Sequence, residues 1–175
     1  MKLGILSDTH KKAGRARRAI DILLTNGAEY LIHAGDVGKE ETLAYMEASG
    51  VPYAAVLGNN DAALKALTSR YHLYTEPHYF AIGRLRVKLM HHPLYLTPDA
   101  DLIVCGHLHR FRAVVREGAL FLNPGEVCAR NKPVSEAVLL EVTPKTWVVH
   151  HYERVIKEKR WQDKSILLPR SERVG

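Results

Sequence analysis

The first ten residues of the chain, MKLGILSDTH (residues 1–10), contain the pattern that decides the fold. Leu3 to Leu6 form a short apolar run that stops at Ser7-Asp8, which is typical of a buried β-strand. The pattern recurs at Tyr30–Ala34, where a second apolar run stops at Gly35-Asp36. We therefore expect consecutive buried strands that each end beside an acidic residue.

Two stretches next to these runs have helical periodicity. Arg15–Leu24 places its apolar side chains on one face, and Asn26-Gly27 ends the predicted helix. Glu40–Ala48 is predicted to be a second helix, and a third strand, Ala54–Leu57, follows it and stops at Gly58-Asn59. Strands that alternate with helices pair in parallel, so the first half of the chain predicts an α/β core.

The second half of the chain is rich in predicted strands. Gly83-Arg84, Glu117-Gly118 and Pro144-Lys145 are typical of hairpin turns, so the strands that flank them are expected to be antiparallel. Both halves together predict an α/β (α+β) fold, a two-sheet β-sandwich flanked by helices. The predicted strands of this half are His78–Ile82, Arg86–Met90, Leu102–Cys105, Phe111–Arg116, Leu120–Leu122, Ala137–Val142 and Trp147–Tyr152.

The length of 175 residues fits one domain, which we expect to span residues 1–175. The charged segment 153–175 could form a tail, an edge strand or a partner-docking arm. No apolar run approaches about 18 residues, so no membrane span is expected. Because the N-terminal apolar run is too short for a signal peptide, we expect a cytoplasmic protein. The apolar strands late in the chain could support a homo-oligomer, a dimer or larger.

The formal net charge is +6 and the isoelectric point is about 9.4, a basic balance that favours anionic ligands such as phosphates. Most of the excess lies near the two ends of the chain, where a solvated surface is the favoured interpretation. Nucleic acid is therefore not expected as a partner. Cys105 and Cys128 have no CxxC spacing and are interpreted as buried free thiols.

Five apolar runs end in Asp, Asn or His beside glycine or another turn residue. In an α/β sheet, ligands bind in the crevice beyond the carboxyl ends of the strands, so these polar groups are expected to converge. Glycines beside them allow sharp turns and a close approach of the backbone. The five endings are Asp8-Thr9-His10, Gly35-Asp36, Gly58-Asn59-Asn60-Asp61, His91-His92 and Gly106-His107-Leu108-His109.

The residue types of this set suit divalent metal ions. Carboxylate and amide oxygens suit manganese or magnesium, while imidazole suits zinc, iron or nickel. A carboxylate between two ions can bridge them, and Asp36, alone on its loop, is the natural bridge. Two such ions can hold a phosphoryl oxygen and an activated water at the same time.

These motifs resemble those of the calcineurin-like metallophosphoesterase superfamily, in particular its small bacterial and archaeal phosphodiesterases. The family pattern is Asp-x-His, then Gly-Asp, then Gly-Asn followed by His or Cys and an acidic residue, then His (usually His-Gly), then Gly-His-x-His. The match runs from residue 8 to residue 109, and Asn123-Pro124-Gly125 resembles a further motif of the small subgroup. The resemblance implies a two-sheet sandwich flanked by helices, in agreement with the residue patterns.

The resemblance implies a dinuclear site for two divalent ions. Manganese is the expected metal, with zinc, iron or nickel as alternatives. The implied reaction is the hydrolysis of small or nucleotide-derived phosphodiesters by a metal-bridging hydroxide. Asp8, His10, Asp36 and His109 would hold the first ion, and Asp36, Asn59, His91 and His107 the second.

Two positions depart from the family pattern and are the candidates for further catalytic residues. Asn60 stands where many relatives have a histidine, and an amide cannot supply a proton to a leaving group. Aryl phosphodiesters, which need little protonation, are therefore favoured substrates. His92 stands where glycine is usual. It could be a substitute acid, a phosphate contact or a surface residue, and a non-catalytic role is favoured.

Several alternatives stay open. Within the same class, the protein could be a phosphomonoesterase. In another class, it could be a metal-binding interaction scaffold with little catalysis, since some members of the fold have become scaffolds. Three further residues are interpreted separately: Asp61 as the cap of a following helix, His33 as a packed residue, and Arg130 as a phosphate contact or a surface residue.

Overall fold

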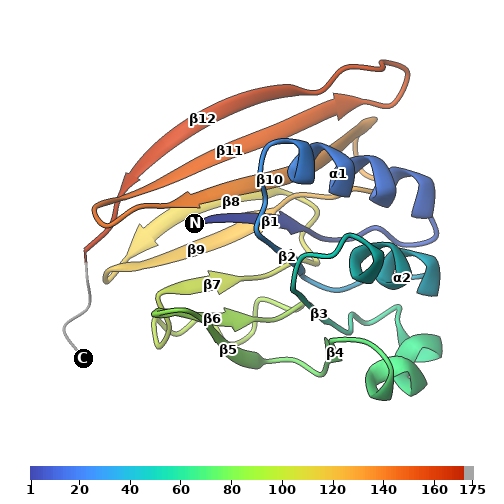
Figure 1. Cartoon of the computed structure of the whole chain (residues 1–175), viewed down its shortest axis with the longest axis horizontal. Helices are drawn as coiled ribbons and strands as arrows, with labels where there is room; N and C mark the ends of the chain where they lie inside the picture. Colours follow the sequence, from blue (N-terminus) through green and yellow to red (C-terminus); the bar gives the residue numbers. More distant parts are fainter. Residues whose placement is uncertain (172–175) are drawn as a thin grey trace.

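The computed structural model describes residues 1–171, and two β-sheets dominate it (Figure 1). The first sheet has seven strands in the order β12-β11-β10-β1-β2-β3-β4, and the second has five in the order β5-β6-β7-β9-β8. The first contains β1 (Lys2–Leu6), β2 (Tyr30–His33), β3 (Tyr53–Val56), β4 (Leu73–Tyr74), β10 (Val134–Val142), β11 (Thr146–Val155) and β12 (Gln162–Pro169). The second contains β5 (His78–Ile82), β6 (Leu85–Leu89), β7 (Leu102–Val104), β8 (Phe111–Arg116) and β9 (Ala119–Pro124).

The first sheet begins as the predicted α/β unit. Strands β1, β2, β3 and β4 pair in parallel, because α1 (Ala13–Thr25), α2 (Glu40–Ala48) and the 3₁₀ helix η1 (Ala62–Ser69) connect them. The apolar face of α1 packs on this sheet through Ala19, Ile20 and Leu23, which lie in one buried cluster with Leu6 and Leu31. The predicted strand–helix alternation of the first half is therefore confirmed.

The two sheets pack face to face over the main apolar core. Ile5 and Ile32 of the first sheet lie in one fully buried cluster with Leu89, Val104 and Leu122 of the second. The predicted hairpins are present as antiparallel pairs β5–β6, β8–β9 and β10–β11. The predicted fold class, a two-sheet sandwich flanked by helices, is confirmed.

The two halves of the sequence do not correspond to the two sheets. β10 pairs antiparallel with β1, so β10, β11 and β12 extend the first sheet although they come last in the chain. Within the segment 153–175, residues 162–169 form the edge strand β12, one of the alternatives left open by the sequence, and residues 172–175 lie outside the described residues. None of the helices in residues 1–171 is long and apolar enough to cross a membrane.

The outer face of the second sheet has a different covering from that of the first. Its apolar cluster contains Met90, Ile103, Cys105, Ala119 and Phe121, and no residue of α1, α2 or η1 is among these. Loop 93–101 lies over part of this face instead. Its anchor is the ammonium group of Lys88, which donates hydrogen bonds to Thr97 Oγ1 at 2.8 Å and Asp99 Oδ1 at 3.0 Å.

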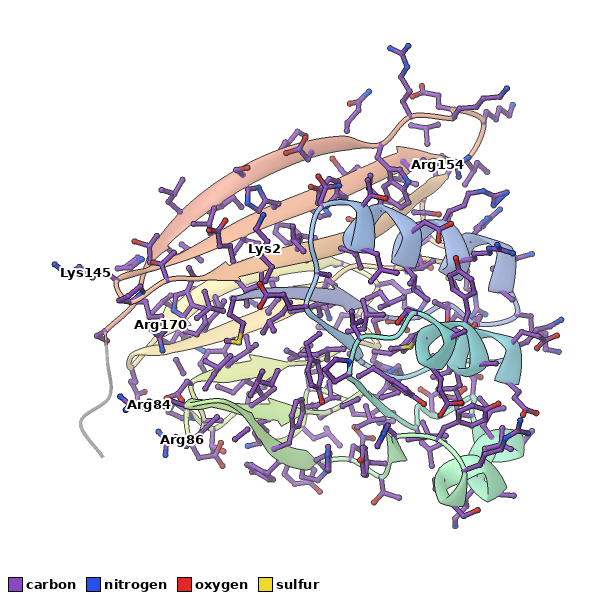
Figure 2. All side chains as sticks on the ribbon, viewed as in Figure 1. Lys2, Arg84, Arg86, Lys145, Arg154 and Arg170 are labelled. Carbon is purple, nitrogen blue, oxygen red and sulfur yellow. The ribbon has the colours of Figure 1, made fainter. Side chains whose placement is uncertain are left out.

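Basic side chains gather at the end of the molecule that carries the hairpin turns (Figure 2). Arg84 lies in the β5–β6 turn and Lys145 in the β10–β11 turn, and Figure 2 shows both at this end together with Arg86 and Arg170. This end holds the amino-terminal ends of β1 and β6. Part of the net positive charge is therefore placed away from the strand ends where ligands were predicted.

Candidate metal centre

The structure places the seven predicted ligands in one cluster at the carboxyl ends of five parallel strands. Asp8 and His10 follow β1, Asp36 follows β2, and Asn59 follows β3. His91 follows β6, and His107 and His109 follow β7. Because β1, β2 and β3 are parallel to one another, as are β6 and β7, these loops leave their sheets at neighbouring edges.

Short distances connect these side chains into two groups. His109 Nε2 lies 3.2 Å from Asp8 Oδ1. Asp36 Oδ2 lies 3.6 Å from His10 Nε2 and 3.5 Å from His91 Nε2. Asn59 Oδ1 lies 3.0 Å from His91 Nε2 and 3.1 Å from His107 Nδ1. Ligand atoms of Asp8, Asp36 and His91 all lie within 4.8 Å of one another, so the two groups meet at these residues.

Five of the seven residues have a left-handed backbone. This conformation is unfavourable for residues with a side chain by about 1 kcal/mol each, and it gathers at functional sites. Backbone hydrogen bonds hold it in place: the N–H of Asp8 donates to Gly35 O at 3.0 Å, and that of His10 to Asp36 O at 2.8 Å. The φ angles are 54° at Asp8, 45° at His10, 52° at Asp36, 65° at His107 and 52° at His109.

The glycines beside the ligands are required because the backbones of neighbouring loops approach each other closely there, as the sequence predicted. A Cβ atom on Gly58 would lie 2.3 Å from the backbone nitrogen of Asp36. One on Gly106 would lie 2.2 Å from Ser7 Oγ and 2.4 Å from Ala34 O. Any side chain at these two positions would push the loops of β2 and β7 apart from their neighbours and open the cluster.

Asp8, His10 and His109 form the first half of the cluster, and a buried carboxylate supports it. His109 Nδ1 lies 2.5 Å from Glu126 Oε2. The imidazole is the donor of this hydrogen bond, because a carboxylate can only accept. His109 Nε2 then faces the carboxylate of Asp8, so either a proton or a metal cation has to lie between them. Without a metal, the pKa of His109 is raised to about 11, chiefly by Asp8, with contributions from Cys128 and Glu126.

Asn59, His91 and His107 form the second half. His91 Nδ1 donates to the carbonyl oxygen of Ala34 at 2.9 Å, which fixes the imidazole so that Nε2 points at Asp36 and Asn59. His91 and Asp36 are buried, whereas Asn59 and His107 are exposed. The second half is therefore the side of the cluster that solvent reaches.

Asp36 lies between the two halves and is held as an anion. Burial by itself would raise its pKa, but the neighbouring imidazole of His91 and the hydrogen bonds from Asn60 outweigh burial and hold the pKa well below its usual range. The backbone N–H of Asn60 donates to Oδ1 at 2.9 Å, and the side-chain amide donates to Oδ2 at 2.7 Å. The predicted bridging carboxylate is thus charged and oriented toward both halves.

The chemistry of these atoms fits bound cations. Asp8 Oδ1 and His10 Nε2 are buried and have no hydrogen-bond partner, although buried polar atoms of folded proteins almost always have one. His91 Nε2, Asp36 Oδ2 and Asn59 Oδ1 converge. The N–H group that a neutral His91 carries at Nδ1 already donates to the carbonyl oxygen of Ala34. Ligand atoms that converge with some of them left unpartnered are stabilised by positive charge, and the set of oxygen and imidazole ligands suits divalent metals.

Comparison with known proteins identifies the family. The model of the calcineurin-like phosphoesterase superfamily domain matches residues 1–145. The chain belongs to the calcineurin-like phosphoesterase superfamily. Its resemblance to this superfamily, inferred from the motifs, is therefore confirmed.

Individual known proteins resemble the chain at low sequence identity. Phosphodiesterase MJ0936 of Methanocaldococcus jannaschii is 27% identical over 149 residues, which covers 73% of this chain and 85% of that protein. Vacuolar Protein Sorting 29 of Cryptosporidium parvum has the same fold, with a TM-score of 0.76, 20% identity and coverage of 97% of this chain and 98% of that one. The structure described as a novel archaeal phosphodiesterase gives a TM-score of 0.71, 23% identity and coverage of 95% and 100%.

The two departures from the superfamily pattern have distinct environments. Asn60 is committed to Asp36 through both its backbone and its side chain. His92 Nδ1 donates to Glu76 Oε1 at 2.5 Å, and its ring centroid lies 4.6 Å from that of His107. Glu76 also accepts the backbone N–H of His91 at 2.6 Å. Asn60 therefore positions a predicted ligand, whereas His92 keeps Nε2 available beside the second half.

Sequence reasoning missed two carboxylates beside the centre, Glu126 and Glu76, and misassigned a third. Asp61 occupies the N-cap position of η1, but its side chain makes no capping hydrogen bond, so the predicted capping role of this carboxylate was wrong. Its buried carboxylate accepts the N–H groups of Val37, Gly38 and Gly58 at 2.9, 2.7 and 2.8 Å instead. Amides from two different loops satisfy the charge better than one helix end would, and they fix the Asp36 loop against the Asn59 loop.

Two other interpretations concern buried residues near the centre. Both cysteines are buried and free, as predicted, but Cys128 lies close to the first half, with Sγ within 4.8 Å of ligand atoms of His10 and His109. His33 is fully buried and forms a 2.9 Å hydrogen bond with Thr9 Oγ1, so its packed role is confirmed. Burial lowers the pKa of His33 to about 4, so it is neutral where it supports the Asp8–His10 loop.

A basic cleft of about 680 Å³ opens beside the centre. Two site residues, His10 and Asn60, form part of its wall, and no Asp or Glu of residues 1–171 lines it. Arg15 is anchored there by a hydrogen bond from its guanidinium to Cys128 O. The cations that line the cleft are Lys11, Lys12, Arg15 and Arg130.

Proposed function

We propose that this protein is a metal-dependent phosphodiesterase that hydrolyses small or nucleotide-derived phosphodiesters at a dinuclear centre. One observation carries the proposal: ligand atoms of carboxylates, an amide and imidazoles converge, two of them buried without a hydrogen-bond partner, in a chain of the phosphoesterase superfamily. The similarity to a protein named as a phosphodiesterase supports the choice of a diester.

The proposed ligand assignment divides the cluster as the geometry does. Asp8, His10 and His109 would hold one divalent ion, Asn59, His91 and His107 the other, and Asp36 both. Manganese is the proposed metal, and zinc, iron and nickel also suit the mixed oxygen and nitrogen donors. When bound, such ions lower the pKa of a water molecule and neutralise charge on phosphoryl oxygens.

The chain's own residues would orient the ligand side chains and attract the substrate. Glu126 and the carbonyl of Ala34 fix the two imidazoles that face the carboxylates, and Asn60 fixes Asp36. The cations of the basic cleft raise the local concentration of an anionic substrate. His92, oriented by Glu76, is the proposed contact for the leaving oxygen, because the side chain of Asn60 is already committed to Asp36.

The test is the hydrolysis of bis-p-nitrophenyl phosphate. We expect turnover by the manganese-loaded protein and strong loss of turnover after chelation and in Asp36→Ala. Equal rates in all three would refute the proposal. p-Nitrophenyl phosphate, measured in parallel, separates a phosphodiesterase from the phosphomonoesterase alternative by the ratio of the two rates.

Bound metal without turnover over a broad panel of phosphate esters would favour the interaction-scaffold alternative. A cytoplasmic location and a homo-oligomer are further parts of the proposal. Light scattering on the purified protein tests the oligomer, and fractionation of the source cells tests the location.

A further inference from the structure

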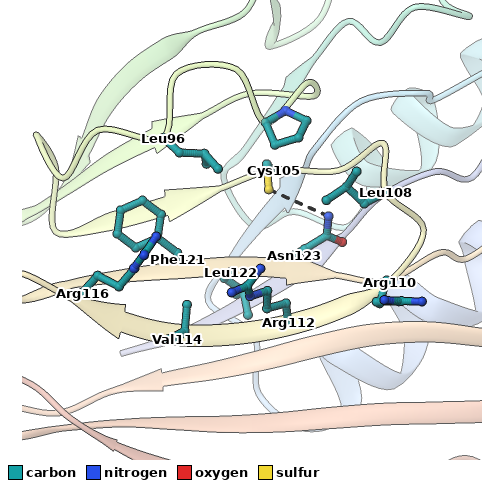
Figure 3. A pocket seen from close by; sticks show the side chains of 11 residues that line it. Leu96, Cys105, Leu108, Arg110, Arg112, Val114, Arg116, Phe121, Leu122 and Asn123 are labelled. Carbon is teal, nitrogen blue, oxygen red and sulfur yellow. Dashed lines mark hydrogen bonds between the residues drawn. The ribbon is translucent and has the colours of Figure 1, made fainter.

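A groove of about 400 Å³ lies on the outer face of the second sheet, outside the candidate metal centre. Figure 3 shows its lining side chains, which come from β8, β9 and two loops. Its volume lies within the range of about 300–1,000 Å³ that is typical of small-molecule sites. The residues that line it are Pro93, Leu96, Cys105, Leu108, Arg110, Arg112, Val114, Arg116, Phe121, Leu122 and Asn123.

One wall of the groove is a row of arginines. Arg112 and Arg116 lie on one face of β8 because side chains alternate along a strand, and Arg110 precedes the strand by one residue in the same alternation. All three are exposed, and none forms an ion pair with a carboxylate of residues 1–171. Like charges held side by side without a counter-ion are unfavourable, so this wall favours an anion.

The other wall is apolar. Leu96 and Leu108 come from the loops opposite the arginine row, and Phe121 lies on β9 between the two walls (Figure 3). Leu96 belongs to the loop that Lys88 anchors through Thr97 and Asp99, and the side chain of Lys88 is only 1% exposed. The Leu96 side of the apolar wall is therefore held in place by an ion pair whose ammonium group is buried.

The groove begins at the metal centre and runs away from it. Leu108 stands between the predicted ligands His107 and His109, and the side-chain amide of Asn123 donates to Gly106 O at 2.8 Å in the same loop. Phe111 pairs with Pro124 at the carboxyl end of β9, whereas Arg116 pairs with Ala119 at its start. The arginine row therefore extends for roughly 20 Å from the ligand edge of the sheet to the opposite edge.

We propose that this groove binds a nucleotide unit of the substrate that carries a second phosphate, with the base on the apolar wall and the second phosphate on Arg112 and Arg116. A flat apolar body with negative charge complements both walls, and guanidinium groups bind phosphate with paired hydrogen bonds. A second copy of this basic chain, docked through the same face, would bring arginines against arginines. The choice of substrate rests on the proposed phosphodiesterase function, whereas the binding itself does not.

The kinetic test uses two substrates that differ only in the second phosphate: the p-nitrophenyl ester of thymidine 5′-monophosphate, with and without a 3′-phosphate. The wild-type protein is expected to have a KM about tenfold lower for the 3′-phosphorylated ester. The double variant Arg112→Gln/Arg116→Gln should lose this preference and keep its rate with bis-p-nitrophenyl phosphate. Arg84→Gln, an exposed arginine in the β5–β6 turn, is the matched control and should keep the preference.

Equal KM values for the two esters in the wild type would overturn the proposal, as would a preference that survives in the double variant. If no ester is hydrolysed, the proposed function fails, and direct binding still decides on the groove. For that measurement, fluorescence anisotropy with N-methylanthraniloyl-labelled adenosine 3′,5′-bisphosphate is performed on the full chain, with and without chelator. We expect at least about tenfold weaker binding in the double variant than in Arg84→Gln. A dimer that dissociates in the double variant would instead assign the groove to contact between copies.

Discussion

The two halves of the proposed metal centre share Asp36 but differ in charge and in burial. The first half adds the buried carboxylate of Asp8, and the buried carboxylate of Glu126 stands behind its His109. The second half adds only neutral ligands, and two of them, Asn59 and His107, are exposed. Negative charge that is kept out of water requires a counter-charge, whereas exposed neutral ligands do not.

The two halves are therefore suited to different tasks. The first half is preorganised by buried anions, so we expect it to retain a divalent ion more strongly. The second half is open to solvent and lies beside His92, so substrate is expected to arrive there. Stepwise removal of metal by increasing chelator should therefore release one ion per chain before the other.

Asp36→Asn is expected to have the largest effect, because it removes charge from both halves. The amide keeps the size of the side chain but cannot bridge two cations as a carboxylate does. We expect metal to be lost from both halves and kcat to fall by about 10³-fold. Metal content by mass spectrometry and rates with bis-p-nitrophenyl phosphate check this. Retention of two ions per chain would show that Asp36 is not shared.

Glu126→Gln should act mainly on the first half. The single amide oxygen can accept either from His109 or from the N–H groups of Asn131 and Lys132, which face different oxygens of the glutamate, and the negative charge behind the imidazole is lost. Loss of such a supporting carboxylate typically lowers metal affinity by about 10- to 100-fold. Calorimetric titration with manganese should show weakening of the tighter step alone.

The control for this change is Glu158→Gln, an exposed glutamate in the turn between β11 and β12, the two outermost strands at one edge of the first sheet. It should leave both steps of the titration unchanged. If Glu126→Gln weakens both steps equally, the division into a buried half and an open half is wrong.

Glu76→Gln should act on the second half and have a smaller effect. Glu76 is partly exposed, and its remaining oxygen can still accept the N–H groups of His91 and His92. We expect kcat to fall by less than about tenfold, with two ions per chain retained. A metal content reduced to one ion would mean that Glu76 supports a ligand rather than His92.

Asn60→Ala is expected to have the smallest effect. Asp36 would lose one hydrogen bond, from the side-chain amide, and keep the bond from the backbone N–H of residue 60. A fall in kcat of about two- to fivefold, from one neutral donor to a charged acceptor, is expected. A loss as large as that of Asp36→Asn would show that Asn60 contacts the substrate instead.

The sequence predicted the parts that depend on short-range pattern. The strands before Asp8, Asp36 and Asn59 are apolar runs that end abruptly, and parallel pairing then brings their ends together. Strand β12 had no such signal, because Gln162–Pro169 is an edge strand whose side chains are mostly exposed. A strand without a buried face has no required alternation of polar and apolar residues.

The supporting carboxylates were not predictable for a different reason. Glu126 and Glu76 lie in segments far along the chain from His109 and His91, and only the tertiary fold brings them together. Asp61 had a local signal, its place before a helix, and that signal was misleading. Two of its three partners are amides 23 and 24 residues earlier in the chain, which no local rule could connect to it.

The left-handed backbone lowers stability at residues that the proposed activity requires. These residues are Asp8, His10, Asp36, His107 and His109. Glycine adopts this conformation freely, so replacing a ligand by glycine would relax the backbone while removing the function. Selection of this protein for heat resistance alone would therefore favour inactive variants. The packing of the two sheets compensates for the unfavourable backbone of the ligand loops. An engineer who wants both properties therefore has to add stability at the sheets rather than at the loops.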